Sequence, residues 1–312
     1  MNWQVDDGTT DTADADISVT FPSVGWHDVK ISVPNGVTYS PYYESSTQSN
    51  ELIGKIQKTI QVFFGDGVAT IGDRAFYYYY YSLTFITIPN GVASIGSSAF
   101  QNCYSLTSII ISGSVTSISF GAFQNCYSLT SIIIPDSITI ICGVDGTAFQ
   151  NCYRLTSINI PDGVTSIGGS NAFQNCYALA SITIPDSLTK ISNNSFQTCY
   201  SLTSITIPNG VTNIYGNAFQ NCYSLTSVNL SNSITSVSSS AFTNCYSLTS
   251  VNLSNSITSI SSNMFSYCYS LTSITIPDSV TSIGSYAFQN CRSLTSITIP
   301  DDVTNIDGYV FY

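Results

Sequence analysis

Residues 202–224 read LTSITIPNGVTNIYGNAFQNCYS, and closely related stretches return along most of the chain. Most copies are 23 residues long when they are aligned on their leucine. The leucines that begin the copies are Leu83, Leu106, Leu129, Leu155, Leu179, Leu202, Leu225, Leu248, Leu271 and Leu294, and a divergent first copy begins near Thr59. A fixed period of this length predicts a solenoid, which grows longer without widening its core.

Each copy contains two extended segments and a turn-rich segment. In the stretch that begins at Leu202, LTSITI alternates apolar and polar residues and is rich in β-branched side chains, so it predicts a short strand. Pro208 and Gly210 end that strand in a turn, and VTNI predicts a second extended piece. The segment AFQNC (218–222) is too short for a stable isolated helix, so we expect one helical or 3₁₀ turn there. The leucine, isoleucines, valine, alanine, phenylalanine and cysteine should point inward, and only stacked copies can bury that set.

The pattern LxxIxIPxxVxxIxxxAFxxCxx resembles the BspA-like leucine-rich repeat, also called the Treponema pallidum type. The resemblance covers residues 59–312. It implies a right-handed solenoid with a parallel β-sheet on its concave face and short helical or 3₁₀ turns elsewhere. It also implies surface adhesion or other protein interaction without enzymatic activity. Departures from the pattern are Ser112, Ser231 and Ser254 in the proline slot, Met264 in the alanine slot and Arg292 in a tyrosine slot.

The copy from Leu129 carries an insertion, CGVDG (142–146), between its second extended segment and its phenylalanine. Segments that tolerate a change in length are normally surface loops. We therefore expect this insertion to form a loop on the surface of the solenoid.

The first 41 residues have a different pattern, which resembles part of a PKD or immunoglobulin-like β module. The resemblance implies that residues 1–41 form a small β-rich module and that 42–58 serve as a linker and N-terminal cap. The positions that carry it are Trp3, Gly8, Phe21, Gly25, Val29, Ile31 and Val33.

Composition argues against several classes of function. Charged residues make up 8% of the chain, the net charge is −11, and only seven residues are Lys or Arg, which argues against a nucleic-acid partner. The chain contains no run of eighteen apolar residues, so the sequence predicts no membrane span. The N-terminus lacks the positive and apolar regions of a signal peptide, so either a leader has been removed or the protein is assembled inside a cell.

The cysteines do not form a metal-site pattern. Zinc sites need paired cysteines at short spacing or clustered histidines, and His27 is the only histidine, so we expect no metal and no cofactor. Stacked cysteines would point in parallel with Cβ atoms about 4.8 Å apart, beyond the usual disulfide spacing of about 3.5–4.5 Å. We expect free, buried thiols at Cys103, Cys126, Cys152, Cys176, Cys199, Cys222, Cys245, Cys268 and Cys291. Cys142, in the insertion, is the one candidate for a reactive thiol.

Acidic residues fall in positions that favour a structural role. Within the repeats, five of them follow proline, where Asp is a turn residue: Asp136, Asp162, Asp186, Asp278 and Asp301. The acidic run in the first sixteen residues does not match the spacing of a calcium loop, which favours a solvated segment over a calcium site. No catalytic constellation is recognisable, so we expect that the protein is not an enzyme.

Two repeating surfaces are candidate binding sites. The outward positions of each LTSITI strand are uncharged and hydroxyl-rich, as at Thr203, Ser204 and Thr206. The second surface is a row of tyrosines two residues before the leucines: Tyr104, Tyr127, Tyr153, Tyr177, Tyr200, Tyr223, Tyr246 and Tyr269. These rings either form an aromatic strip for a protein or glycan ligand, or pack on one another and shield the edge of the coil.

Near-identical copies favour an extended, multivalent contact over a pocket for one small ligand. The leading interpretation is a surface-displayed adhesion or interaction protein whose partner is a host or microbial surface protein or glycan. The alternatives are a phage or virion receptor-binding protein and a structural spacer or filament subunit. We accordingly expect an extracellular or cell-surface location, with the virion surface as the alternative.

The last copy, which begins at Leu294, ends at its phenylalanine slot and leaves an open end. Weak end-to-end self-association is therefore expected. Asp301, Asp302 and Asp307 could oppose that association, and Tyr309 and Tyr312 are candidates to cover the apolar end.

Overall fold

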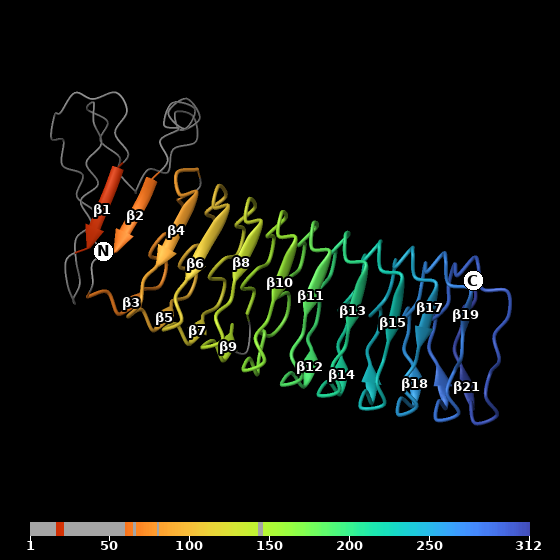
Figure 1. Cartoon of the computed structure of the whole chain (residues 1–312). Helices are drawn as coiled ribbons and strands as arrows, with labels where there is room; N and C mark the ends of the chain where they lie inside the picture. The colour runs from red at the N-terminus through yellow and green to blue at the C-terminus, as the bar shows by residue number, and fades with distance from the viewer. Residues whose placement is uncertain (1–16, 22–59, 65–66, 80, 143–145) are drawn as a thin grey trace.

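The computed structural model describes residues 17–21, 60–64, 67–79, 81–142 and 146–312. Through these residues the chain forms a solenoid of parallel strands, with successive coils side by side along one axis (Figure 1). The solenoid predicted from the repeat is confirmed.

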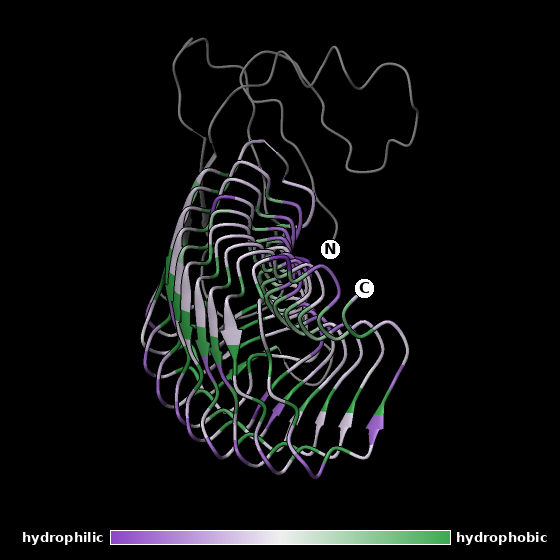
Figure 2. Ribbon diagram, turned by 90° about the vertical axis from the view of Figure 1, so that its right-hand side faces the viewer, coloured by the Kyte–Doolittle hydropathy of each residue, from purple (hydrophilic) through white to green (hydrophobic). Residues whose placement is uncertain are grey.

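Two rows of strands run along the solenoid, on two different sides of the coil (Figure 2). The long-strand row holds the strands of the LTSITI segments, which are β4 (Phe85–Ile88), β6 (Ser108–Ile111), β8 (Ser131–Ile133), β10 (Ser157–Asn159), β11 (Ser181–Thr183), β13 (Ser204–Thr206), β15 (Ser227–Asn229), β17 (Ser250–Asn252) and β19 (Ser273–Ile274). At its N-terminal end the row continues with β2 (Ile60–Phe64), from the divergent first copy, and β1 (Ile17–Phe21), which precedes the repeats. The short-strand row comes from the second extended segments and holds β3 (Thr70–Ile71), β5 (Ser94–Ile95), β7 (Ser117–Ile118), β9 (Ile140–Ile141), β12 (Lys190–Ile191), β14 (Asn213–Ile214), β16 (Ser236–Val237), β18 (Ser259–Ile260), β20 (Ser282–Ile283) and β21 (Asn305–Ile306).

Neighbouring strands pair in parallel, and equivalent positions of successive copies lie opposite one another. Ser204 pairs with Ser227, and Ile205 pairs with Val228. In β13 the middle residue is buried and the two flanking residues are exposed, as the period-two pattern predicted. A side chain therefore has its own equivalents as neighbours, one strand spacing of about 4.8 Å away on either side.

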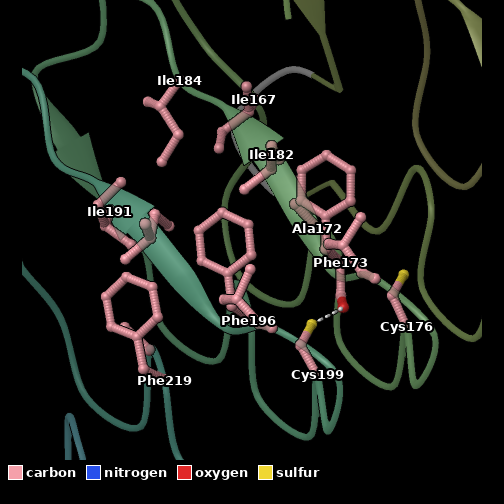
Figure 3. Packing of buried hydrophobic residues seen from close by; sticks show 14 of the residues in the cluster. Ile167, Ala172, Phe173, Cys176, Ile182, Ile184, Ile191, Phe196, Cys199 and Phe219 are labelled. Carbon is pink, nitrogen blue, oxygen red and sulfur yellow. Dashed lines mark hydrogen bonds between the residues drawn. The ribbon is translucent and has the colours of Figure 1, made fainter. Parts of the chain in front are cut away.

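The predicted inward set forms the core. In the copy that begins at Leu202, each of the expected side chains is buried: Leu202, Ile205, Ile207, Val211, Ile214, Ala218, Phe219 and Cys222. The phenylalanines stack with nearly parallel rings, and Figure 3 shows part of this spine. The ring centroids of Phe173 and Phe196 are 5.6 Å apart, and those of Phe196 and Phe219 are 5.3 Å apart. Stacked copies thus bury one continuous apolar core.

The expected helical or 3₁₀ turn at AFQNC is wrong, because a left-handed residue interrupts the segment every four residues. Asn217 and Asn221 have φ of 56° and 63°. Asparagine adopts this region more readily than most residues, so the segment becomes a series of turns. The amides of Ala218, Gln220 and Cys222 bond within the coil, whereas those of Phe219 and Asn221 bond to the carbonyls of Ala241 and Thr243 in the next coil.

The insertion in the copy from Leu129 does not interrupt the spine. Phe149, which follows it, lies 5.5 Å from Phe123 and 5.4 Å from Phe173, measured between ring centroids. Residues 143–145 lie outside the described residues. The spine therefore continues past this change in length, and the surface loop expected at the insertion stays a prediction.

The N-terminal prediction is only partly within the described residues. β1 pairs in parallel with β2, with Ile17 opposite Ile60. The rest of 1–41 and all of 42–58 lie outside the described residues, so the PKD or immunoglobulin-like module and the linker stay predictions.

The C-terminal end of the solenoid exposes apolar side chains. Phe311 stacks on Phe288 with one face, and the residue is 54% exposed. The expected covering of this end by Tyr309 and Tyr312 is wrong: Tyr309 stacks on Tyr286 in the preceding coil, and both tyrosines are themselves exposed. Asp301, Asp302 and Asp307 are exposed in the same coil.

The spine should contribute more to stability than the tyrosine row. We expect Phe219→Ala to lower the free energy of unfolding by about 3–5 kcal/mol, because it leaves a cavity in a fully buried stack. Tyr223→Ala should lower it less, since Tyr223 is only half-buried, and Tyr223→Phe, which retains the ring, is the control. Chemical denaturation of the three variants measures the difference, and equal losses for the two alanine variants would contradict this placement of the rings.

The three carboxylates of the last coil should limit association between open ends. Replacing Asp301, Asp302 and Asp307 with Asn removes like charges that two such ends would bring together. We expect sedimentation velocity at matched concentration to show more dimer for the triple variant than for the parent. If the two proteins sediment alike, these carboxylates are turn residues and do not control association.

Candidate functional site

Eight tyrosines form one continuous stack along the edge where the long strands begin. Successive ring centroids are 4.4–5.0 Å apart, and the ring planes differ by 4° to 17°. The members are the predicted residues Tyr104, Tyr127, Tyr153, Tyr177, Tyr200, Tyr223, Tyr246 and Tyr269, here called the tyrosine ladder. The predicted row of tyrosines is therefore present in the structure, and each ring packs on the next.

Backbone hydrogen bonds set the spacing of the ladder. The carbonyls of most of these tyrosines accept the amide of the residue that follows the tyrosine of the next coil, as from Ser224 to Tyr200 (3.2 Å) and from Ser247 to Tyr223 (3.1 Å). These bonds hold the tyrosine backbones one coil apart. That step, about 4.8 Å, lies within the range of separations at which aromatic rings stack favourably.

The two ends of the ladder differ. An aromatic run in the sequence, YYYYY (77–81), was a candidate to extend the strip or to form a cap contact at one end, whereas the role of Arg292 at the other end was not recognised. Tyr81 occupies the same slot one copy earlier and meets Tyr104 edge to face, with centroids 5.9 Å apart. At the other end the guanidinium of Arg292 lies 4.8 Å from the centroid of Tyr269. Arg292 departs from the tyrosine of its slot, and the cation–π contact explains how it ends the stack. Both residues could be found from the sequence, because each lies two residues before the leucine of its copy.

The ladder presents ring edges and neutral hydroxyl groups to solvent. Burial raises the pKa of Tyr153, Tyr177 and Tyr223 above its ordinary value, and neighbouring tyrosines raise it further. These phenols therefore stay protonated at neutral pH. Because both faces of each inner ring contact another ring, a ligand can meet these tyrosines only at their edges and hydroxyl groups.

The strand face, made of the outward side chains of the long-strand row, lies directly beside the ladder. Between β4 and β19 its residues are Ser, Thr, Asn or apolar, and none is charged. Part of its hydroxyl chemistry is already used, since the Oγ1 atoms of Thr226 and Thr249 donate to the carbonyls of Thr203 (3.2 Å) and Thr226 (3.0 Å). The face is thus uncharged and held rigidly by bonds between coils.

A third repeating surface, on the turn segments, was also missed in the sequence. Side-chain amides form two ladders there, in which Asn125 donates to Asn102 (2.7 Å) and Gln101 donates to Gln124. Both chains of bonds continue over several coils. The recurring Gln-Asn pair was the available signal, but it becomes informative only when equivalent residues are known to lie in contact.

The cysteine column is structural. All cysteines are free, as predicted, and those of the shared slot are buried except Cys291, which is half-buried. The structure adds a bond that the sequence did not predict: each of these thiols donates to the phenylalanine carbonyl of the preceding coil, as from Cys222 to Phe196 (3.2 Å). Burial raises the pKa of these thiols, so they remain protonated and link one coil to the next.

The prediction that Cys142 is a reactive thiol is wrong. Its side chain is buried, and its Sγ atom donates to the carbonyl of Ser119 at 3.6 Å. Burial raises the pKa of this thiol to about 12. Cys142 is the first residue of the insertion, but its side chain still packs into the core of the coil. Its position in the insertion therefore wrongly suggested an exposed thiol.

Among the residues that the structure describes, no group of three or more His, Cys, Asp or Glu side chains could hold a metal ion. Within the same residues, no helix is long and apolar enough to cross a membrane.

Comparison with protein families identifies the repeat. The description "BspA type Leucine rich repeat region (6 copies)" matches residues 69–203, 143–272 and 189–312. Together these matches cover most of the chain. A comparison with curated proteins finds no match.

Solved structures of leucine-rich repeat proteins are similar to this chain. A leucine-rich repeat protein from Bacteroides ovatus is 27% identical, with 93% of this chain and 82% of that one covered and a TM-score of 0.51. One from Eubacterium ventriosum is 22% identical, with 80% and 81% covered and a TM-score of 0.50, and it supports the fold alone. A leucine-rich cell surface protein from Faecalibacterium prausnitzii is 27% identical over 97% of this chain and 89% of that one, with a TM-score of 0.45.

The burial of the thiols predicts their reactivity. In the native protein at mildly alkaline pH we expect an alkylating reagent to label Cys291 slowly and the inner cysteines only after denaturation, because the inner thiols are both covered and protonated. Mass spectrometry of the labelled peptides checks this. In a Cys291→Ser variant the native labelling should almost disappear, whereas rapid native labelling of Cys199 or Cys222 would contradict the placement of the column.

Proposed function

The chain belongs to the BspA type leucine-rich repeat family, and we propose that it is a non-enzymatic adhesion and protein-interaction module displayed at a cell surface. Solenoids of this kind are scaffolds that present an extended surface to a partner. The fold and the family support the scaffold role, and the binding face, the partner and the location are part of the proposal.

The observation that carries the proposal is a face, composed of the strand face and the tyrosine ladder, that continues from coil to coil. Tyrosine is well suited to recognition, since its ring gives contact area at a low entropic cost and its hydroxyl group forms hydrogen bonds. In the ladder the rings are already fixed by their neighbours, so binding need not order them.

The chemistry of this face favours a protein partner over a stacked sugar. Sugar rings bind aromatic side chains mainly through the flat face of the ring, and the inner rings of the ladder have both faces occupied. Hydroxyl groups and ring edges instead suit the polar and apolar groups of a protein surface. Because the strand face has no charged side chain, binding should depend little on salt.

Repetition increases the strength of such a contact. Successive coils present the same groups at a step of about 4.8 Å, so a partner that engages one coil is already placed to engage the next. Many weak and identical contacts then act together, and a partner on a cell surface, which is itself repeated, gains most.

Binding can be tested by probing arrays of host and microbial surface proteins and glycans with the purified chain. For any protein that binds, Ser227→Lys places a charge on the strand face in β15, and we expect it to weaken binding by about tenfold or more. Ser236→Lys makes the same change at an exposed position of β16 in the same coil, on the short-strand row, and should leave binding unchanged.

The hydroxyl groups of the ladder have a separate test. Replacing Tyr177, Tyr200 and Tyr223 with Phe keeps the stack and removes only the outward oxygens, so a weaker complex would assign binding to those groups. If neither the Phe variant nor Ser227→Lys alters binding, the partner uses another face. If no protein or glycan binds at all, the role of a structural spacer is favoured instead.

A further inference from the structure

Three adjacent strands interrupt the polar strand face with exposed apolar side chains. Phe85 begins β4, Ile110 is the third residue of β6, and Ile133 is the third residue of β8. The three residues are 41%, 51% and 76% exposed. These three residues are here called the apolar patch.

The three side chains are close enough to act together. Ile110 and Ile133 are register partners on neighbouring strands, and their side chains project from the same face about 4.8 Å apart. Phe85 lies on the next strand, diagonal to Ile110, within reach of an aromatic side chain. Tyr81, the first ring of the ladder's slot, precedes Phe85 by four residues and is 58% exposed.

The other copies show that the fold does not require these side chains. The slot of Ile110 and Ile133 holds Asn159, Thr183, Thr206, Asn229 and Asn252 in later coils, all of them exposed. The slot of Phe85 holds serine in each of the following eight copies, from Ser108 to Ser273. Coils with polar residues there pair and pack in the same way, so the patch adds nothing that the core or the sheet needs.

An exposed apolar cluster in a polar surround has the composition of a binding anchor. Interfaces commonly have an apolar centre with a polar rim, and a few central side chains carry most of the binding free energy. Here the Ser, Thr and Asn side chains of the neighbouring strands form the rim. Scattered single apolar residues would need no such explanation, but three on adjacent strands of one face do.

We propose that the apolar patch is the anchor point of the binding face and seats aliphatic or aromatic side chains from an uncharged peptide segment of a partner protein. The inference rests on the proposed function and assigns the contact that would give it specificity. The occupant is uncharged because no charged side chain projects from the strands that surround the patch.

The size of the patch also indicates the kind of occupant. A stable interface between two proteins buries about 1,200–2,000 Å² in total, far more than three side chains supply. A second copy of the chain meeting it patch to patch would therefore gain too little. A peptide segment can seat its apolar residues in the patch while the rest of the partner lies along the polar face.

The test uses random-sequence peptides displayed on phage and selected against the whole chain. We expect enriched peptides to carry aliphatic or aromatic residues and no net charge, and to bind equally in about 0.1 M and about 1 M salt. Ile110→Thr with Ile133→Thr should weaken a selected peptide by about tenfold or more. Ile140→Thr, which removes an exposed isoleucine (43%) from the short-strand row of the same coil as Ile133, is the matched control and should have no effect.

A second variant transplants the patch. Ser204→Phe, Asn229→Ile and Asn252→Ile place the same three side chains at the equivalent positions of β13, β15 and β17. Calorimetry with a selected peptide should then give two peptides bound per chain instead of one. Misfolding cannot create a second binding site. The transplant therefore tests the proposal even if the threonine variant is unstable.

Several outcomes would overturn the inference. They are the absence of enriched peptides, binding that survives the threonine substitutions, strong dependence on salt, and a transplant that adds no site. A parent that sediments as a dimer and becomes monomeric in the threonine variant would show that a second copy occupies the patch. If surface proteins bind with sensitivity to Ser227→Lys but not to Ile110→Thr with Ile133→Thr, the proposed function stands and the anchor does not.

Discussion

The parallel pairing of equivalent strands, one coil step apart, is the constraint on which the rest of this structure depends. It places almost every side chain between two copies of itself at a separation of about 4.8 Å. A residue can recur in a slot only if it interacts favourably with itself at that distance. Phenylalanine and tyrosine stack, asparagine and glutamine donate and accept in chains, and apolar side chains pack. Carboxylates and ammonium groups repel, which agrees with the low charge of the chain and with the placement of Asp in exposed turns.

The same constraint produces columns of identical residues both in the core and on the surface, and the two kinds of column have different roles. Within the coil, the phenylalanine spine is fully buried, and the cysteine thiols tie each coil to the carbonyl of the preceding one. Outside, the tyrosine ladder and the amide ladders repeat without burying an apolar core. The outer ladders therefore carry chemistry that a partner can reach, whereas the inner columns mainly hold the coils in register.

Because the copies are so similar, the residues that differ from the repeat pattern are easy to recognise. Arg292 ends the tyrosine ladder with a cation–π contact, and the insertion after Ile141 leaves the phenylalanine spine intact. Phe85, Ile110 and Ile133 are a different kind of departure, because no neighbouring coil needs them and they face solvent. In an array of near-identical units, such exceptions can give one partner a unique place to bind.

The sequence by itself determined the solenoid, the two extended segments of each copy, the inward set from Leu202 to Cys222 and the free state of the cysteines, because these follow from a short period and from local alternation. It also placed the eight tyrosines in one row. Tertiary structure alone decided what each slot does with its neighbours: that the rings of the ladder contact face to face, that Tyr81 and Arg292 end it, that Cys142 is buried, and that AFQNC is a series of turns. The physical reason is that these properties depend on contacts between residues one coil apart and on backbone angles such as those of Asn217 and Asn221, neither of which local periodicity encodes.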